Sequence, residues 1–205
     1  MRAAHLIERH PEAWHAATHH PFLDAVRDGA LPADAFAAWL TQDYLFVGDL
    51  LAAQARLLAR APRPDHGVLA GGLVAVEAEL GWFERQAELC GVALRAPRHP
   101  TTVAYNAALE GLDREPYGAA LVALWALERA YLEAWRGAAP GQVAYREFVD
   151  HWTTPAFAAY VVGLEAAADR ALVAGDTEGV VERAFREVVR LEQAFWAMSW
   201  AESDR

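Results

Sequence analysis

The spacing of apolar residues predicts helices along almost the whole chain. Phe36, Leu40, Val47 and Leu50 recur at three- and four-residue intervals, which places them on one buried stripe of a helix. This helix is expected to run from Pro32 to about Arg60. Similar patterns predict helices over residues 2–19, 20–28, 68–89, 101–112 and 117–136, a helical pair broken at 151–155, and a last helix from about 176–177. The sequence therefore predicts an all-α helical bundle.

Three carboxylates fall on the apolar stripes of three different predicted helices. Asp43 shares the stripe of Leu40 and Val47. Glu128 takes a position where leucine is expected on the stripe of the 117–136 helix, which comprises Leu121, Leu124, Trp125, Leu132 and Trp135. Glu192 lies in the seven-residue gap between the inward residues of the last helix, which are Val181, Phe185, Val188, Phe195 and Ser199. An unpaired buried carboxylate costs several kcal/mol, so each acid must be paired, protonated or functional.

Two interpretations of these acids remain open. Each could pair with an arginine at a helix seam, for which Arg56, Arg129 and Arg186 are candidates. Alternatively, all three converge in a closed apolar pocket, because aromatic residues flank each of them and the arginines fall mostly on outward faces. Such a pocket would raise carboxyl pKa values and favour general acid chemistry near neutral pH.

Other candidate residues lie at helix faces and junctions. Glu79 flanks the predicted inward stripe, so both a partly buried and a solvated carboxylate are consistent with the pattern; that stripe comprises Leu73, Val76, Leu80 and Phe83. Tyr105 lies on an apolar face and is expected to be a core residue whose hydroxyl is satisfied. Trp152 precedes a Thr-Pro helix start, where an aromatic side chain can point into a cavity.

Five of the eight histidines lie within the first 20 residues. Glu12, His15 and His19 would share a helix face, and Glu-x-x-His is half of a di-iron carboxylate signature. The second Glu-x-x-His is absent, and Pro11 interrupts the segment. We expect these histidines to be solvated or to cap helices, and we expect no metal.

Composition narrows the classes of function. The chain has 205 residues, which favours one domain, and a net charge of −10, which argues against nucleic acid and anionic membranes as partners. The single cysteine, Cys90, cannot form an internal disulfide. No apolar run is long enough to cross a bilayer, and the first residues are too polar for a signal peptide. A cytoplasmic protein is expected.

Several ordered motifs resemble the TenA family, also called thiaminase II, whose all-helical fold is shared with haem oxygenase. The segments are HPFLDAVRDGALPADAFAAWLTQDYLFV, VEAELGWFERQAELCGV, HPTTVAYNAAL, LWALERAYLEAW, FVDHWTTPAFAAYVVGL and VVRLEQAFWAMSW. The resemblance extends over nearly the whole chain. It implies one TenA-like domain over residues 1–205, no cofactor, and a homo-oligomer, either a dimer or a tetramer.

The resemblance also implies roles for particular residues. Asp43 matches the aspartate that holds the aminopyrimidine ring of the substrate, and Phe46 would be a stacking wall one turn later. Glu192 matches the acid/base glutamate near the C-terminus. Tyr105 and Trp152 match aromatic pocket positions, and many relatives carry tyrosine at the latter.

The sequence departs from the family pattern at the nucleophilic cysteine. The Pro-Cys motif is missing, Ala126 stands about where the cysteine would be, and Cys90 lies in a different motif. The chain instead resembles the glutamate-type branch, in which Glu128 and Glu79 are pocket candidates. That branch implies a hydrolase that salvages thiamin breakdown products by cleaving amino or formylamino groups from an aminomethylpyrimidine.

Without a thiolate, direct attack by water is the expected mechanism. Glu192 or Glu128 would take a proton from water while the other acid protonates the departing nitrogen. A non-catalytic protein that binds a small heterocycle or acts as a regulator is a second hypothesis, because the cysteine is missing. A haem or di-metal oxidase that uses the N-terminal histidines is a third, because the fold is shared.

Overall fold

The computed structural model describes residues 1–173 and 178–201, and they form helices joined by short connections. The elements are α1 (Ala4–Arg9), α2 (Pro11–Thr18), α3 (Pro21–Asp28), α4 (Ala33–Ala59), η1 (Arg63–Asp65), α5 (His66–Cys90), α6 (Pro100–Gly111), η2 (Leu112–Arg114), α7 (Tyr117–Gly137), α8 (Arg146–Trp152), α9 (Pro155–Val173) and α10 (Glu178–Ala201). The predicted all-α fold is confirmed.

Proline and glycine set many of the helix boundaries. Helices α2, α3, α6 and α9 each begin at a proline, whose missing N–H costs nothing in the first turn. Gly29 and Gly91 follow α3 and α5 in the left-handed conformation, with φ of 75° and 67°. The predicted N-cap at the start of α9 is confirmed, since Thr154 Oγ1 accepts a hydrogen bond from the N–H of Phe157 at 3.1 Å.

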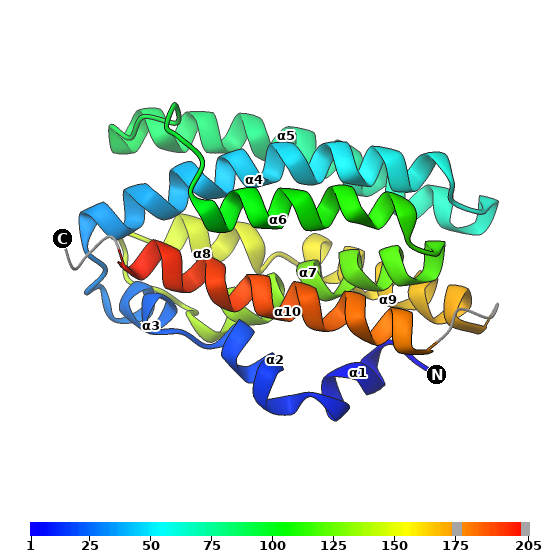
Figure 1. The fold of residues 1–205 in the computed structure, drawn as a ribbon. Coiled ribbons are helices and arrows are strands. Elements are labelled where there is room, and N and C mark those ends of the chain that lie inside the picture. The colour runs from blue at the N-terminus through cyan, green and yellow to red at the C-terminus, as the bar shows by residue number, and fades with distance from the viewer. Residues whose placement is uncertain (174–177, 202–205) are drawn as a thin grey trace.

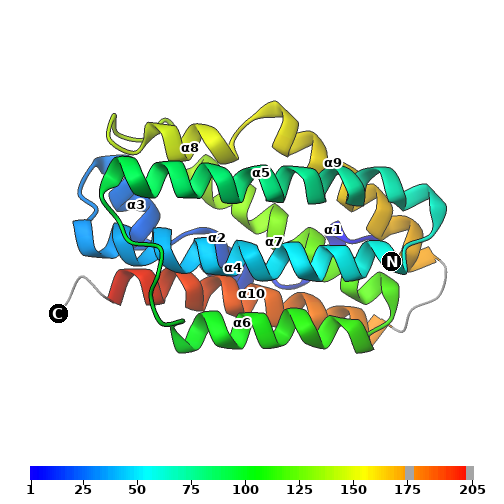
Figure 2. The same ribbon diagram turned by 90° about the horizontal axis from the view of Figure 1, so that it is seen from above.

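Helix α7 lies in the middle of the bundle. It contacts α2, α8, α9 and α10, while α4 contacts α5, α6 and α10. Figure 1 shows α4, α5 and α6 on one side of the molecule and α1 and α2 on the other, with α7, α9 and α10 between them. Figure 2 shows α4 alongside α5, and α10 alongside α6. Helices α4, α7 and α10 all contact one another, and α5 packs on α4, so the inward faces of α4, α7 and α10 pack together.

Some details of the predicted elements were wrong. Residues 2–19 form two helices, because the chain turns at His10 before Pro11. Leu73 and Leu80 are only half-buried, whereas Val76 and Phe83 are buried as predicted, since α5 lies at the outer edge of the bundle. The predicted start of the last helix at residues 176–177 lies outside the described residues.

Helix α7 is buried far beyond its predicted stripe. Every residue from Gly118 to Glu128 is buried, because other helices surround this half of α7. Alanine fills the positions between the larger side chains, which allows the neighbouring helices to approach closely. The inward residues predicted for α7 and for the described part of α10 are all buried.

His5, His15, His19 and His20 have solvated or capping positions, as predicted, whereas the half-buried His10 instead pairs with a glutamate. His20 Nδ1 caps α3 by accepting a hydrogen bond from the N–H of Phe22 at 3.2 Å. His10 lies 2.8 Å from Glu182 of α10, whereas the His15 and His19 rings are exposed and stacked on each other. None of the helices in the described residues is long and apolar enough to cross a membrane.

Candidate functional site

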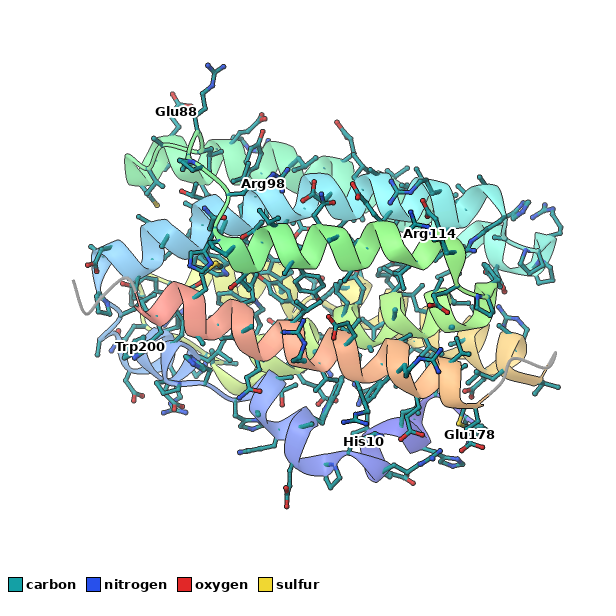
Figure 3. The ribbon with its side chains drawn as sticks, viewed as in Figure 1. His10, Glu88, Arg98, Arg114, Glu178 and Trp200 are labelled. Carbon is teal, nitrogen blue, oxygen red and sulfur yellow. The ribbon has the colours of Figure 1, made fainter. Side chains whose placement is uncertain are left out.

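The three carboxylates predicted on apolar stripes are all buried. Asp43 is 2% exposed, Glu128 6% and Glu192 4%, on α4, α7 and α10 respectively. Their burial contrasts with the outer surface, where Figure 3 labels the exposed charged side chains of Glu88, Arg114 and Glu178.

The arginine-pairing interpretation does not hold for these acids. Arg56 pairs with Asp113 at 2.7 Å, and Arg129 pairs with Glu133 and with Glu165. Arg186 is exposed on the outer face of α10. Within residues 1–173 and 178–201, no cationic side chain lies within ion-pair distance of the three buried acids.

Each buried acid, and Glu79 beside them, instead accepts a hydrogen bond from a neutral side chain of another helix. The donors are Tyr131 to Asp43 Oδ2, Tyr105 to Glu192 Oε1, Gln54 Nε2 to Glu128 Oε1 at 3.2 Å, and Trp152 Nε1 to Glu79 Oε1 at 2.6 Å. These bonds orient the carboxylates without neutralising them. The four acids and their donors are called the acid cluster below.

Burial and mutual charge repulsion both raise the pKa values in the acid cluster. Burial is the largest cause of the rise in each acid, and it raises the pKa of Glu192 to about 8 and that of Glu79 to about 7. The charges of Glu79 and Glu192 further raise the pKa values of both Asp43 and Glu128. Hydrogen bonds from the four donors act in the opposite direction. Such a cluster retains protons near neutral pH.

Glu79 is the most accessible of the four acids. Its side chain is 18% exposed, and its Oε1 lies 3.9 Å from His151 Nε2. Burial lowers the pKa of His151 to about 4, so the imidazole is neutral at neutral pH and does not balance the carboxylate charge. The partly buried alternative for Glu79 is the one that the structure adopts.

Aromatic rings surround the acid cluster. Phe46 packs against Tyr105 with ring centroids 4.5 Å apart and against Phe195 at 5.8 Å. The Trp152 ring stacks on Trp135, and Tyr131 stacks on Trp196. Tyr105 also lines a surface groove of about 460 Å³ between α6 and α10, so this side chain separates the groove from Glu192.

The structure brings together all of the predicted site residues. Asp43, Glu79, Glu128, Glu192, Tyr105 and Trp152 belong to the acid cluster, and the Phe46 ring packs against Tyr105. Tyr131 and Gln54 were not predicted as site residues. Both lie at inward positions of their helices, so a polar side chain on an apolar stripe was the available signal.

Cys90 lies away from this cluster. It is exposed at the C-terminal end of α5, as expected for a cysteine outside the site, whereas Ala126 is buried in α7. Among the described residues, no group of three or more histidine, cysteine, aspartate or glutamate side chains is arranged to hold a metal ion.

The fold and the site define an all-helical bundle that encloses a cluster of acids. Residues 7–202 match the TENA/THI-4/PQQC family, and the chain belongs to this family. A curated protein of Glycine max, named "Probable bifunctional TENA-E protein", is 30% identical over 211 residues, which span 94% of this chain and 90% of that protein. This name agrees with the glutamate-type branch.

Solved structures share the fold. The TenA homologue PF1337 from Pyrococcus furiosus superposes with a TM-score of 0.91 at 26% identity, covering 98% of this chain and all of the other. A putative TenA-like thiaminase from Sulfolobus solfataricus P2 has a TM-score of 0.83 at 21% identity, covering 96% of this chain and 94% of the other. The chain therefore has the TenA fold.

Proposed function

We propose that this protein is a C–N hydrolase of the thiamin-salvage type that cleaves an amino or formylamino group from an aminomethylpyrimidine. The observation that carries this proposal is the acid cluster: four carboxylates on α4, α5, α7 and α10 each accept a hydrogen bond from a neutral side chain of another helix. Burying acids without counter-charges destabilises a fold, so a functional reason for their retention is favoured.

An aminopyrimidine suits this environment chemically. Its ring is flat and can stack against an aromatic wall such as Phe46, which packs on Tyr105. The ring nitrogen and the amino group beside it together offer an acceptor and a donor, which match the two oxygens of Asp43 when its carboxyl group carries a proton. Burial raises the pKa of Asp43 well above its ordinary value, which favours that protonated form.

The proposed reaction needs one acid and one base. One of Glu128 and Glu192 takes a proton from water as the water oxygen bonds to the carbon that carries the leaving group. The C–N bond breaks, and the other glutamic acid gives its proton to the departing nitrogen. The products are ammonia and a hydroxymethylpyrimidine; for the formyl derivative, water attacks the formyl carbon and yields formate and the amine.

Covalent catalysis by cysteine is not part of this proposal, because the only cysteine is Cys90 at the surface. The similarity to a protein named TENA-E supports a glutamate-based variant of the family chemistry. Aromatic side chains around the cluster would exclude bulk water and strengthen its hydrogen bonds to the substrate.

Release of ammonia and formate from aminomethylpyrimidine and its N-formyl derivative tests the proposal. We expect turnover by the unaltered protein and its loss in Asp43→Asn and Glu192→Gln, with helicity retained in circular dichroism. Asp34→Asn on α4 and Glu187→Gln on α10 are matched controls at exposed positions and are expected to keep turnover. A thermal shift on ligand addition with no product would identify a non-catalytic binder instead.

A further inference from the structure

Gln54 is a buried polar residue that links the acid cluster to a second layer of side chains. It lies on the same face of α4 as Asp43 and is 1% exposed. Its Nε2 donates to Glu128 Oε1 at 3.2 Å, and its Oε1 accepts from the Tyr160 hydroxyl at 3.4 Å. A glutamine amide has one donor end and one acceptor end, so the bond from Tyr160 fixes which end faces Glu128.

Close packing of Tyr160 against α5 holds this arrangement in place. A Cβ atom added to Gly72 would lie 2.4 Å from the Tyr160 hydroxyl oxygen and 2.7 Å from Cζ. Glycine in a helix interior is unfavourable, and here the close approach of Tyr160 accounts for it. The contacts therefore run from the backbone of α5 through Tyr160 of α9 and Gln54 of α4 to Glu128 of α7.

We propose that Gln54 is a positioning residue for Glu128. Tyr160 orients the Gln54 amide so that its N–H group donates to Oε1 of Glu128. Oε2 of Glu128 then stays available for proton exchange with the substrate or water. Because Oε1 is occupied as an acceptor, a proton on Glu128 resides on Oε2. For Glu192 the position of the proton is not fixed in this way, because the hydroxyl of its partner Tyr105 can either donate or accept a hydrogen bond. This inference rests on the proposed function, in which Glu128 exchanges a proton during turnover.

The groups that act on Glu128 come from α4, α5 and α10. The charges of Glu79 on α5 and Glu192 on α10 raise the pKa of Glu128, after burial as the largest cause, and the Gln54 hydrogen bond lowers it. The charge of Glu128 in turn raises the pKa values of Tyr105 on α6 and Tyr160 on α9, which stay neutral. Asp43 lies on the same face of α4 as Gln54.

Gln54→Met tests the proposal, because methionine keeps the length of the side chain but removes the N–H donor. We expect kcat to fall by about tenfold or more and KM to change by less than about threefold, since a positioning residue affects the reacting group rather than ground-state binding. Loss of the donor raises the pKa of Glu128, so a limb of the pH–rate profile moves to higher pH. The acidic limb moves if Glu128 is the base, and the basic limb moves if it is the acid.

Tyr160→Phe and Gly72→Ala provide independent variants, because both disturb the orientation of Gln54 while keeping its amide. Each is expected to move the same limb in the same direction by a smaller amount. Tyr117→Phe is the matched control: its hydroxyl donates to buried Asp65 at 2.9 Å outside the acid cluster, and its removal should move neither limb.

Unchanged limbs in Gln54→Met and Tyr160→Phe would overturn the proposal, as would a rise in KM with unchanged kcat. A carboxyl ¹³C titration of Glu128 by NMR separates this result from a failure of the proposed function, because it needs no turnover. A higher Glu128 pKa in Gln54→Met supports the positioning role even if the unaltered protein proves inactive. An unchanged Glu128 pKa contradicts that role.

Discussion

The hydroxyl of Tyr131 on α7 donates a hydrogen bond to Asp43 Oδ2 on α4. Asp43 is almost fully buried, and this bond is the interaction that opposes the rise in its pKa. Tyr131 also stacks on Trp196 of α10, so its ring is held in place independently of the bond. Asp43 is thus oriented from the central helix of the bundle.

Tyr131→Phe is expected to weaken the contact between Asp43 and the pyrimidine ring. The protonated Asp43 carboxyl is neutral, and a hydrogen bond between neutral groups contributes about 0.5–1.5 kcal/mol, so kcat/KM for the aminomethylpyrimidine should fall by roughly two- to tenfold. Steady-state rates of ammonia release provide the measurement. Tyr44→Phe is the matched control, because the Tyr44 hydroxyl donates to exposed Glu84, and unchanged kcat/KM is expected there. Equal losses in both variants would argue against a specific role for Tyr131.

The acid cluster should make the protein less stable as pH rises. The folded-state pKa values of Glu79, about 7, and Glu192, about 8, lie above their ordinary value of 4.5. Stability from the protonated forms is therefore complete below about pH 4.5 and is lost as pH rises through 8. We expect this contribution to the free energy of unfolding to be lower at pH 8.5 than at pH 5.5 by a few kcal/mol.

Glu192→Gln should flatten that dependence, because the amide stays neutral and can still accept the Tyr105 hydrogen bond. Melting temperatures measured between pH 5.5 and 8.5 give the comparison. Glu187→Gln, on the outer face of the same helix, should retain the slope of the unaltered protein. A slope unaffected by Glu192→Gln would mean that Glu192 is ionised throughout this range.

Trp152→Phe should weaken substrate binding, because the Glu79 carboxylate loses the hydrogen bond that orients it. The substitution removes the indole N–H that donates to Glu79 Oε1 at 2.6 Å, and the pKa of Glu79 then rises above about 7. An increase in KM of about tenfold is expected, in line with the loss of one charge-assisted hydrogen bond. Trp14→Phe removes a similar bond to Glu133 at 2.7 Å between α2 and α7 and serves as the control. A larger KM in the control than in Trp152→Phe would contradict this assignment.

Cys90 should be dispensable for turnover. Because its thiol lies at the surface end of α5, Cys90→Ser and alkylation with iodoacetamide should both leave kcat/KM within about twofold of the unaltered value. Mass spectrometry confirms complete alkylation before the rates are compared. Inactivation that substrate prevents would instead indicate a catalytic thiol.

The sequence predicted most of the helices and the acids of the site. Asp43, Glu128 and Glu192 were recognisable because a carboxylate on an apolar stripe is costly, and their burial follows from helical periodicity alone. Gln54 gave the same signal, eleven residues after Asp43, but a neutral amide conflicts less strongly with an apolar environment.

Pairings between distant helices could not be predicted in this way. Trp152 and Glu79 are 73 residues apart, and periodicity gives the face of each residue but not the helix that it meets. Tyr131 was missed as a donor because tyrosine on an apolar stripe is usually a core residue. The complete burial of half of α7 was missed as well, since alanine is compatible with both buried and exposed helix faces.

The most direct test of the central claim is a crystal structure of the Glu192→Gln variant with a bound aminomethylpyrimidine. We expect the pyrimidine ring to stack against Phe46, with its amino group within hydrogen-bond distance of Asp43 and its aminomethyl nitrogen facing Glu128 and residue 192. A pyrimidine bound elsewhere on the molecule, with Asp43 and Glu128 out of contact, would contradict the claim that these buried acids form one substrate site.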